Sequence, residues 1–144
     1  MASLASLLRP VTLLAINLLL LMIWGFASIS KLREGMPAWF DGKFGKTFFA
    51  TFPGLPATFW ILAISELLAF ALGIAALARI EFLRQRPPAF LALTTAWSLF
   101  VFLQLGFGQW LTGEFNGAFQ QFMYFCGTLV ALQCIQAQPK TAGH

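Results

Sequence analysis

Charged side chains are scarce in this sequence of 144 residues. Asp, Glu, Lys and Arg together make up 10% of it, whereas apolar residues make up 59%. A soluble globular domain carries about 25% charged residues, because water must solvate its surface. Nine basic and five acidic residues cannot cover a chain of this length. The composition therefore excludes an ordinary soluble domain and indicates a protein whose solvent is lipid.

Metal ligands are equally few. Histidine occurs once, as the C-terminal His144, and the two cysteines are Cys126 and Cys134. Zinc and iron–sulfur sites of the ordinary types, and haem, need more ligands than one such chain offers, and a bis-histidine haem is excluded outright. The two cysteines are separated by roughly 12 Å if their apolar run is a helix, too far for a disulfide. We expect both to be inert thiols.

Long apolar runs, in contrast, are abundant. Four of them cover approximately residues 10–30, 56–78, 88–107 and 115–135. Each has the length of about 20 residues that a helix needs to cross a bilayer, and open strands are not stable in lipid. The sequence therefore predicts an all-α integral membrane protein, with residues 1–144 forming one four-helix bundle domain. No Ala-x-Ala cleavage site follows the first run, so we expect this helix to be retained.

The distribution of basic residues predicts the orientation. With both termini on one side, that side holds five basic residues and the other side four. The five are Arg9, Arg79, Arg84, Arg86 and Lys140. The turn between the second and third spans is compact and basic, whereas the turn between the third and fourth has no Lys or Arg. We therefore expect both termini in the cytoplasm. The net charge of +4 suits an anionic leaflet and requires no nucleic-acid partner.

Residues 37–52, between the first two spans, have an amphipathic pattern. Three phenylalanines recur every four residues, and lysines fall on the other faces. Such a helix lies in the membrane interface, with its aromatic face toward lipid or the bundle. It serves as an anchor or, alternatively, as a lid or a docking surface for a partner. We expect six aromatic residues at the membrane interface: Trp39, Phe40, Phe44, Phe48, Trp60 and Trp110.

Glu66 is a charged residue near the middle of the second span. A charge at this depth costs about 2.5–3.5 kcal/mol, so it is expected to face the bundle and to be partnered or protonated. It is either a structural clamp between helices, or a group that handles protons or bonds to a polar head group. Other polar residues fall in the same outer half of the bundle. The candidate ligand-binding residues are therefore Glu66, Ser28, Lys31, Gln104, Gln120 and Gln121.

Three short motifs resemble the DoxX family. Residues 24–32 (WGFASISKL) resemble the end of its first helix, residues 65–68 (SELL) its second helix, and residues 115–119 (FNGAF) the start of its last helix. The resemblance extends from about Leu13 to Leu132. It implies a four-helix protein of the bacterial inner membrane with both termini in the cytoplasm. It also implies association with redox complexes, since the clan includes DoxD-type quinol oxidase subunits and MauE proteins.

Two positions depart from the family pattern. Many members have a histidine late in the third helix, where this chain has Gln104, and a glutamate at the start of the fourth, where it has Gln120 and Gln121. A glutamine amide forms hydrogen bonds but does not transfer protons near neutral pH. These differences weaken the case for catalysis by this chain on its own.

Three hypotheses of function follow. The first is a non-catalytic accessory or structural subunit of a larger membrane complex, of redox or energy-converting type. The second is a redox-linked subunit that binds a quinone through Glu66, Gln104 and Gln120. The ring of that quinone is expected to pack on an aromatic residue: Trp24, Phe26 or Trp60. The third is a small transporter with Glu66 as its proton site. The sequence requires no cofactor, and a quinone or another lipophilic ligand, such as a carotenoid, is compatible with it.

Overall fold

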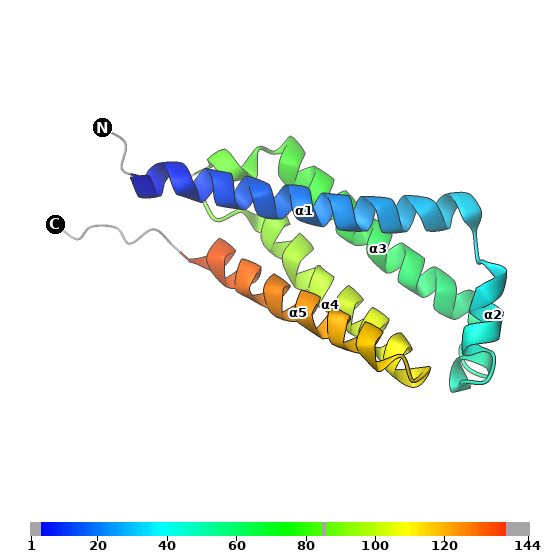
Figure 1. The fold of residues 1–144 in the computed structure, drawn as a ribbon. Helices are drawn as coiled ribbons and strands as arrows, with labels where there is room; N and C mark the ends of the chain where they lie inside the picture. Colours follow the sequence, from blue (N-terminus) through cyan, green and yellow to red (C-terminus); the bar gives the residue numbers. More distant parts are fainter. Residues whose placement is uncertain (1–3, 85, 138–144) are drawn as a thin grey trace.

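The computed structural model describes residues 4–84 and 86–137, and Lys140 and His144 lie outside them. Four long helices form a bundle: α1 (Leu4–Glu34), α3 (Leu55–Ala78), α4 (Ala89–Leu111) and α5 (Phe115–Gln136) (Figure 1). The connections contain a short helix, α2 (Ala38–Phe44), and two 3₁₀ turns, η1 (Phe48–Ala50) and η2 (Glu81–Leu83). The described chain contains no strand. The predicted all-α four-helix bundle is confirmed.

The four long helices have the length and apolar composition of membrane spans. The segments that meet both criteria are Leu7–Glu34, Leu55–Ala78, Ala89–Leu111 and Phe115–Gln136. Large apolar side chains lie on the outside of the bundle, among them Phe26 and Phe119, which are 76% and 62% exposed. Such a surface is stable against lipid and not against water. The chain is a multi-pass integral membrane protein.

Two of the three prolines expected at the starts of the spans lie there, and the third, Pro10, does not. Pro56 occupies the first turn of α3, and Pro88 immediately precedes α4. Pro10 lies inside α1, because the helix begins at Leu4, six residues before the expected start of the span. The residues upstream of Pro10 include Leu and Ala, which favour helix, so the helix extends beyond the apolar run itself.

Helices that follow one another in sequence pack side by side. α3 lies between α1 and α4, and α5 packs principally against α4. In Figure 1, the start of α1 and the end of α5 lie at one end of the bundle, and the two helices diverge toward the end that carries α2. The buried residues of α5 are Thr128 and Ile135, so most of this helix faces outward.

Small and polar residues bring α1 close to α3. A Cβ atom added to Gly73 would lie 3.0 Å from the Leu21 Cδ2, so a side chain there would have to displace the end of Leu21 by a few tenths of an ångström. Asn17 is 1% exposed, and its amide fits between the Gly73 carbonyl oxygen (3.1 Å) and the Leu77 backbone N–H (3.3 Å) in the orientation that satisfies both. Buried amides of this kind hold transmembrane helices together.

The amphipathic segment is not one continuous helix. α2 ends at Phe44, where the backbone N–H of Gly45 donates to the Asp41 carbonyl oxygen, and a turn then leads into η1. Phe40 and Phe44 are therefore on one helix face, while Phe48 lies on a different element. The expected stripe with a four-residue period is wrong beyond Phe44, because a period of four keeps residues on one face only while the helix continues.

Candidate functional site

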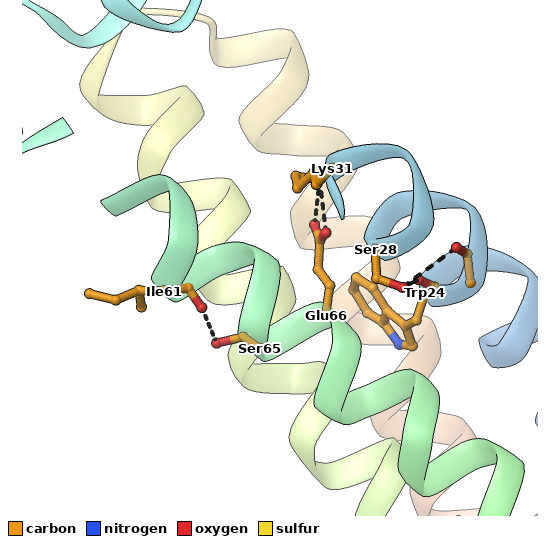
Figure 2. A network of polar contacts seen from close by, with 7 residues as sticks. Trp24, Ser28, Lys31, Ile61, Ser65 and Glu66 are labelled. Atoms are coloured by element: carbon orange, nitrogen blue, oxygen red, sulfur yellow. Dashed lines mark hydrogen bonds and ion pairs between the residues drawn. The ribbon is translucent and has the colours of Figure 1, made fainter. Parts of the chain in front are cut away.

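An ion pair inside the bundle joins α1 to α3. The Lys31 Nζ donates to both carboxylate oxygens of Glu66, to Oε1 at 3.0 Å and to Oε2 at 2.8 Å (Figure 2). The side chain of Glu66 is 1% exposed and that of Lys31 is 24% exposed. Two of the predicted site residues are thus in direct contact. Lys31 engages both carboxylate oxygens, so the ion pair links α1 directly to α3.

Two serines near this ion pair bond to their own helices. The Ser28 Oγ donates to the Trp24 carbonyl oxygen at 2.6 Å, and the Ser65 Oγ donates to the Ile61 carbonyl oxygen at 2.8 Å (Figure 2). Bonds from a hydroxyl to the carbonyl four residues earlier satisfy the hydroxyl within its own helix. Ser28, a predicted site residue, is fully buried on the same face of α1 as Lys31.

α4 reaches this region through Ser65. The Gln104 Nε2 donates to the Ser65 Oγ at 3.3 Å, and the Trp97 Nε1 donates to the Ser65 carbonyl oxygen at 2.9 Å. Since Ser65 directly precedes Glu66, these bonds place the amide of Gln104, another predicted site residue, beside the segment that carries the ion pair. Three helices, α1, α3 and α4, therefore contribute polar groups to one region.

A cavity of about 520 Å³ lies at the diverging end of the bundle, between α2 and the adjoining ends of α1, α3 and α4. We call it the α2 cavity. Its aromatic wall includes Phe40, Phe44, Phe49, Phe59 and Phe107. Its polar lining residues include Lys31, Glu34, Lys43, Gln104 and Gln109. A mostly apolar cavity of a few hundred Å³ with a few polar groups is typical of sites for small lipophilic molecules.

Two sets of contacts hold α2 over this cavity. On the inner side, Phe40 packs against Phe59, with ring centroids 5.5 Å apart. On the outer side, the Lys43 Nζ donates to the Gln109 Oε1 at 3.1 Å and to the Glu114 Oε2 at 2.8 Å. Lys43 and Gln109 are not among the predicted site residues. Their role in holding α2 depends on a contact between residues more than 60 positions apart in the sequence. No local sequence pattern indicates such a contact.

The aromatic residues expected to pack against a ring do not line the cavity. Trp24 is 1% exposed, because it lies in the core beside Phe102 and its Nε1 donates to the Ser98 Oγ at 2.8 Å. Phe26 and Trp60 are 76% and 40% exposed, and neither lines the cavity. Phe40, Phe44 and Phe49 of the amphipathic segment, together with Phe59 of α3 and Phe107 of α4, provide the wall instead. The repeated aromatic residues of the amphipathic segment are the sequence signal that indicates the first three.

The two glutamines of α5 do not join the polar region. Gln120 is exposed on α5, and Gln121 is partly buried where α5 packs against Gly106 of α4. The Oε1 of Gln121 has no hydrogen-bond partner among the described residues. Neither glutamine lines the α2 cavity. The expected cluster therefore lacks both, because α5 packs mainly on α4 and contributes no residue to the cavity lining.

The six aromatic residues expected at the interface divide into two groups. Trp39, Phe48, Trp60 and Trp110 are 62%, 53%, 40% and 66% exposed, as side chains that face a membrane interface would be. Phe40 and Phe44 are only 5% and 9% exposed, because they pack on the bundle with Phe59. The aromatic face of this segment was expected to lie toward lipid or toward the bundle, and these two residues lie toward the bundle.

Within residues 4–84 and 86–137, no group of three or more His, Cys, Asp or Glu side chains is placed to hold a metal ion. The fold defines the class of protein, a multi-pass integral membrane protein built as a helical bundle. The chain matches no protein-family model, no curated protein and no solved structure.

Proposed function

We propose that this chain is a DoxX-like accessory subunit of a membrane redox complex, and that it holds a quinone-like lipophilic ligand in the α2 cavity. The α2 cavity, with its aromatic wall and polar groups, is the observation that carries the proposal. Phenylalanine rings suit a flat ring, and the amide of Gln104 is a donor for a ring carbonyl. Lys31 is a second donor, because an ammonium has three N–H groups and Glu66 accepts from only two of them.

The proposed role is binding and positioning, not catalysis. Glu66, the charged residue at the middle of α3, is held by Lys31 through both carboxylate oxygens. The cavity amides, Gln104 and Gln109, donate and accept hydrogen bonds but do not transfer protons near neutral pH. A transporter that uses Glu66 as its proton site would have to break this ion pair in each cycle, so the geometry favours the accessory role.

The proposed location is the bacterial inner membrane, with both termini in the cytoplasm. Two observations support the orientation. The basic turn that carries Arg79, Arg84 and Arg86 lies at the end of the bundle where α1 starts, and the opposite turn, between α4 and α5, carries Glu114 and no basic residue. Basic residues are enriched on the cytoplasmic side of membrane proteins. The resemblance of residues 24–32, 65–68 and 115–119 to the DoxX family supports the same assignment.

The ligand is tested by extraction. The full chain is purified in mild detergent from membranes of its native host, and bound lipophilic compounds are extracted and identified by mass spectrometry. Leu62→Trp enlarges a side chain that lines the cavity, whereas Leu67→Trp on the same helix does not touch it. We expect a ring compound with carbonyl groups from the wild type and from Leu67→Trp, and its loss from Leu62→Trp. Native protein that yields no such compound overturns the binding role.

The accessory role is tested separately. We expect the chain to migrate from gently solubilised native membranes in a complex with redox proteins. Recovery of the chain only as a free monomer at several detergent concentrations contradicts the accessory role, whatever the extraction gives. The two experiments therefore distinguish failure of the ligand proposal from failure of the partner proposal.

A further inference from the structure

Four arginines gather at the end of the bundle opposite to the α2 cavity. Arg9 lies in α1, and its Nη1 donates to the Arg84 carbonyl oxygen at 3.1 Å, which ties α1 to the turn after η2. Arg79 directly follows the last residue of α3, and Arg86 lies just before α4. Arg79, Arg84 and Arg86 are exposed, and Arg9 is half-buried. We call these four residues the arginine end.

No carboxylate neutralises this charge in the described part of the chain. The ion pairs there are Lys31–Glu66 and Lys43–Glu114, and neither involves these arginines. Glu81 is the acid nearest to them in sequence. It is 6% exposed, and its carboxylate accepts from the backbone N–H groups of Phe90 at 3.1 Å and Leu91 at 2.9 Å. Its charge is therefore engaged at the N-terminus of α4, where a helix dipole favours an anion.

The guanidinium groups retain N–H donors for an anion. Arg79 lies over the ring of Phe90, with its Cζ 4.4 Å from the ring centroid. A guanidinium stacked on a ring uses its face and leaves the N–H groups of its edge free. Arg9 uses one of its five N–H groups on the Arg84 carbonyl. Arginine edges of this kind bind phosphate through paired hydrogen bonds.

Exposed apolar side chains surround the same arginines. Ile80 and Leu83, in the turn that carries Arg79 and Arg84, are 49% and 65% exposed. On α1, Leu7, Leu8 and Val11 are 58%, 54% and 65% exposed beside Arg9. A soluble acidic partner would gain little from this mixture, whereas a phospholipid has a phosphate for the arginines and acyl chains for the apolar residues.

We propose that the arginine end is a binding site for the head group of an anionic phospholipid, such as phosphatidylglycerol, with its acyl chains against Ile80, Leu83 and the start of α1. Charge complementarity carries this assignment: four cations that form no ion pair with a carboxylate of residues 4–84 or 86–137 lie beside exposed apolar surface at the end of membrane-spanning helices. The site lies at the opposite end from the α2 cavity and stands independently of the function proposed for that cavity.

The test measures phospholipid binding to the full chain in detergent by native mass spectrometry. Dioleoylphosphatidylglycerol is the probe, and dioleoylphosphatidylcholine, a zwitterion with no net charge, is the reference. One variant, Arg79→Gln/Arg84→Gln, removes two charges from the arginine end. The matched control, Arg33→Gln/Lys46→Gln, removes two exposed charges near the opposite end. Each basic residue near an anionic surface contributes about fivefold in affinity, so we expect the first variant, which removes two, to bind phosphatidylglycerol about 25-fold more weakly.

Three outcomes overturn the proposal. The first is an equal loss in Arg33→Gln/Lys46→Gln, which attributes binding to net charge alone. The second is equally tight binding of phosphatidylcholine to the wild type. The third is release of phosphatidylglycerol by inorganic phosphate at the same concentration, which indicates a site for free phosphate and not for lipid. Arg79→Lys/Arg84→Lys, which keeps the charge, is expected to bind better than the glutamine variant, and circular dichroism verifies that every variant is helical.

Discussion

Lys31 and Glu66 lie 35 residues apart in the sequence and meet inside the bundle, with the Lys31 Nζ at 2.8 and 3.0 Å from the two carboxylate oxygens. The ion pair links the last turn of α1 to the middle of α3. Its partners differ in their access to the outside: Glu66 is 1% exposed, while the side chain of Lys31 is 24% exposed and lines the α2 cavity. Removing the charge of Lys31 and removing the charge of Glu66 are therefore expected to lower the free energy of unfolding by different amounts.

We expect Lys31→Met to lower the free energy of unfolding by about 3–5 kcal/mol, because it leaves the Glu66 carboxylate buried without a counterion. Glu66→Gln removes the buried charge itself and leaves a lysine that can reach the exterior, so its cost is smaller, about 1–3 kcal/mol. Reversible unfolding in mixed micelles with increasing dodecyl sulfate measures both values.

The double variant Lys31→Met/Glu66→Gln provides the control for this prediction. It leaves no buried charge, so it is expected to be more stable than Lys31→Met alone, although it carries one more substitution. Additive losses in the double-mutant cycle would show that the two side chains do not interact in the membrane protein.

The close approach of α1 to α3 gives a second prediction. A Cβ atom at Gly73 lies 3.0 Å from the Leu21 Cδ2 and 3.6 Å from the Thr94 Cγ2, whereas one at Gly127 meets no atom within 4 Å. We expect Gly73→Val to destabilise the bundle by about 1–3 kcal/mol through overpacking. The matched change Gly127→Val on α5 is expected to be nearly neutral. Equal midpoints of thermal unfolding for the two variants would contradict the observed helix packing.

The sequence predicts the helices well because the bilayer fixes their length. A run of about 20 apolar residues in lipid forms a helix, because only a helix satisfies all of its backbone hydrogen bonds within the run. The same run does not show which face packs inward, because lipid and protein interior are equally apolar. Trp24 illustrates this ambiguity: it stands near the end of a span, where an interfacial position is typical, but it is buried against Phe102.

The site was harder to predict than the spans. Depth along each helix correctly brings Lys31, Glu66 and Gln104 into one region, because it depends only on the rise per residue. Depth does not give the rotation of a helix or the identity of its neighbours. Gln120 and Gln121 lie at a similar depth, but α5 packs on α4 and contributes nothing to the α2 cavity. The cavity itself depends on the position of α2, which is set by contacts between distant residues.

The ion pair that joins α2 to Glu114 gives a third prediction. Glu114 is 51% exposed, and it accepts from the Lys43 Nζ at 2.8 Å. An exposed pair contributes about 0–1 kcal/mol, so Glu114→Gln is expected to leave global stability nearly unchanged. Local opening of α2 depends on this pair, and we expect amide hydrogen exchange in Ala38–Phe44 to become roughly two- to fivefold faster. Asp41→Asn, an exposed acid on the same helix, is the control. Equal acceleration in both variants contradicts a specific role for the Lys43–Glu114 pair.

The start of α4 gives a fourth prediction. Pro88 precedes the helix and forms no side-chain cap, so the N–H groups of Phe90 and Leu91 depend on the Glu81 carboxylate, at 3.1 and 2.9 Å. Glu81→Ala leaves two N–H groups without this acceptor at the start of a span, and we expect a loss of about 1–3 kcal/mol. Glu81→Gln retains one acceptor oxygen and is expected to lose less. Glu34→Ala, at an exposed position, should stay within about 0.5 kcal/mol of the wild type. If the unfolding free energies of Glu81→Ala and Glu34→Ala are equal, Glu81 does not cap α4.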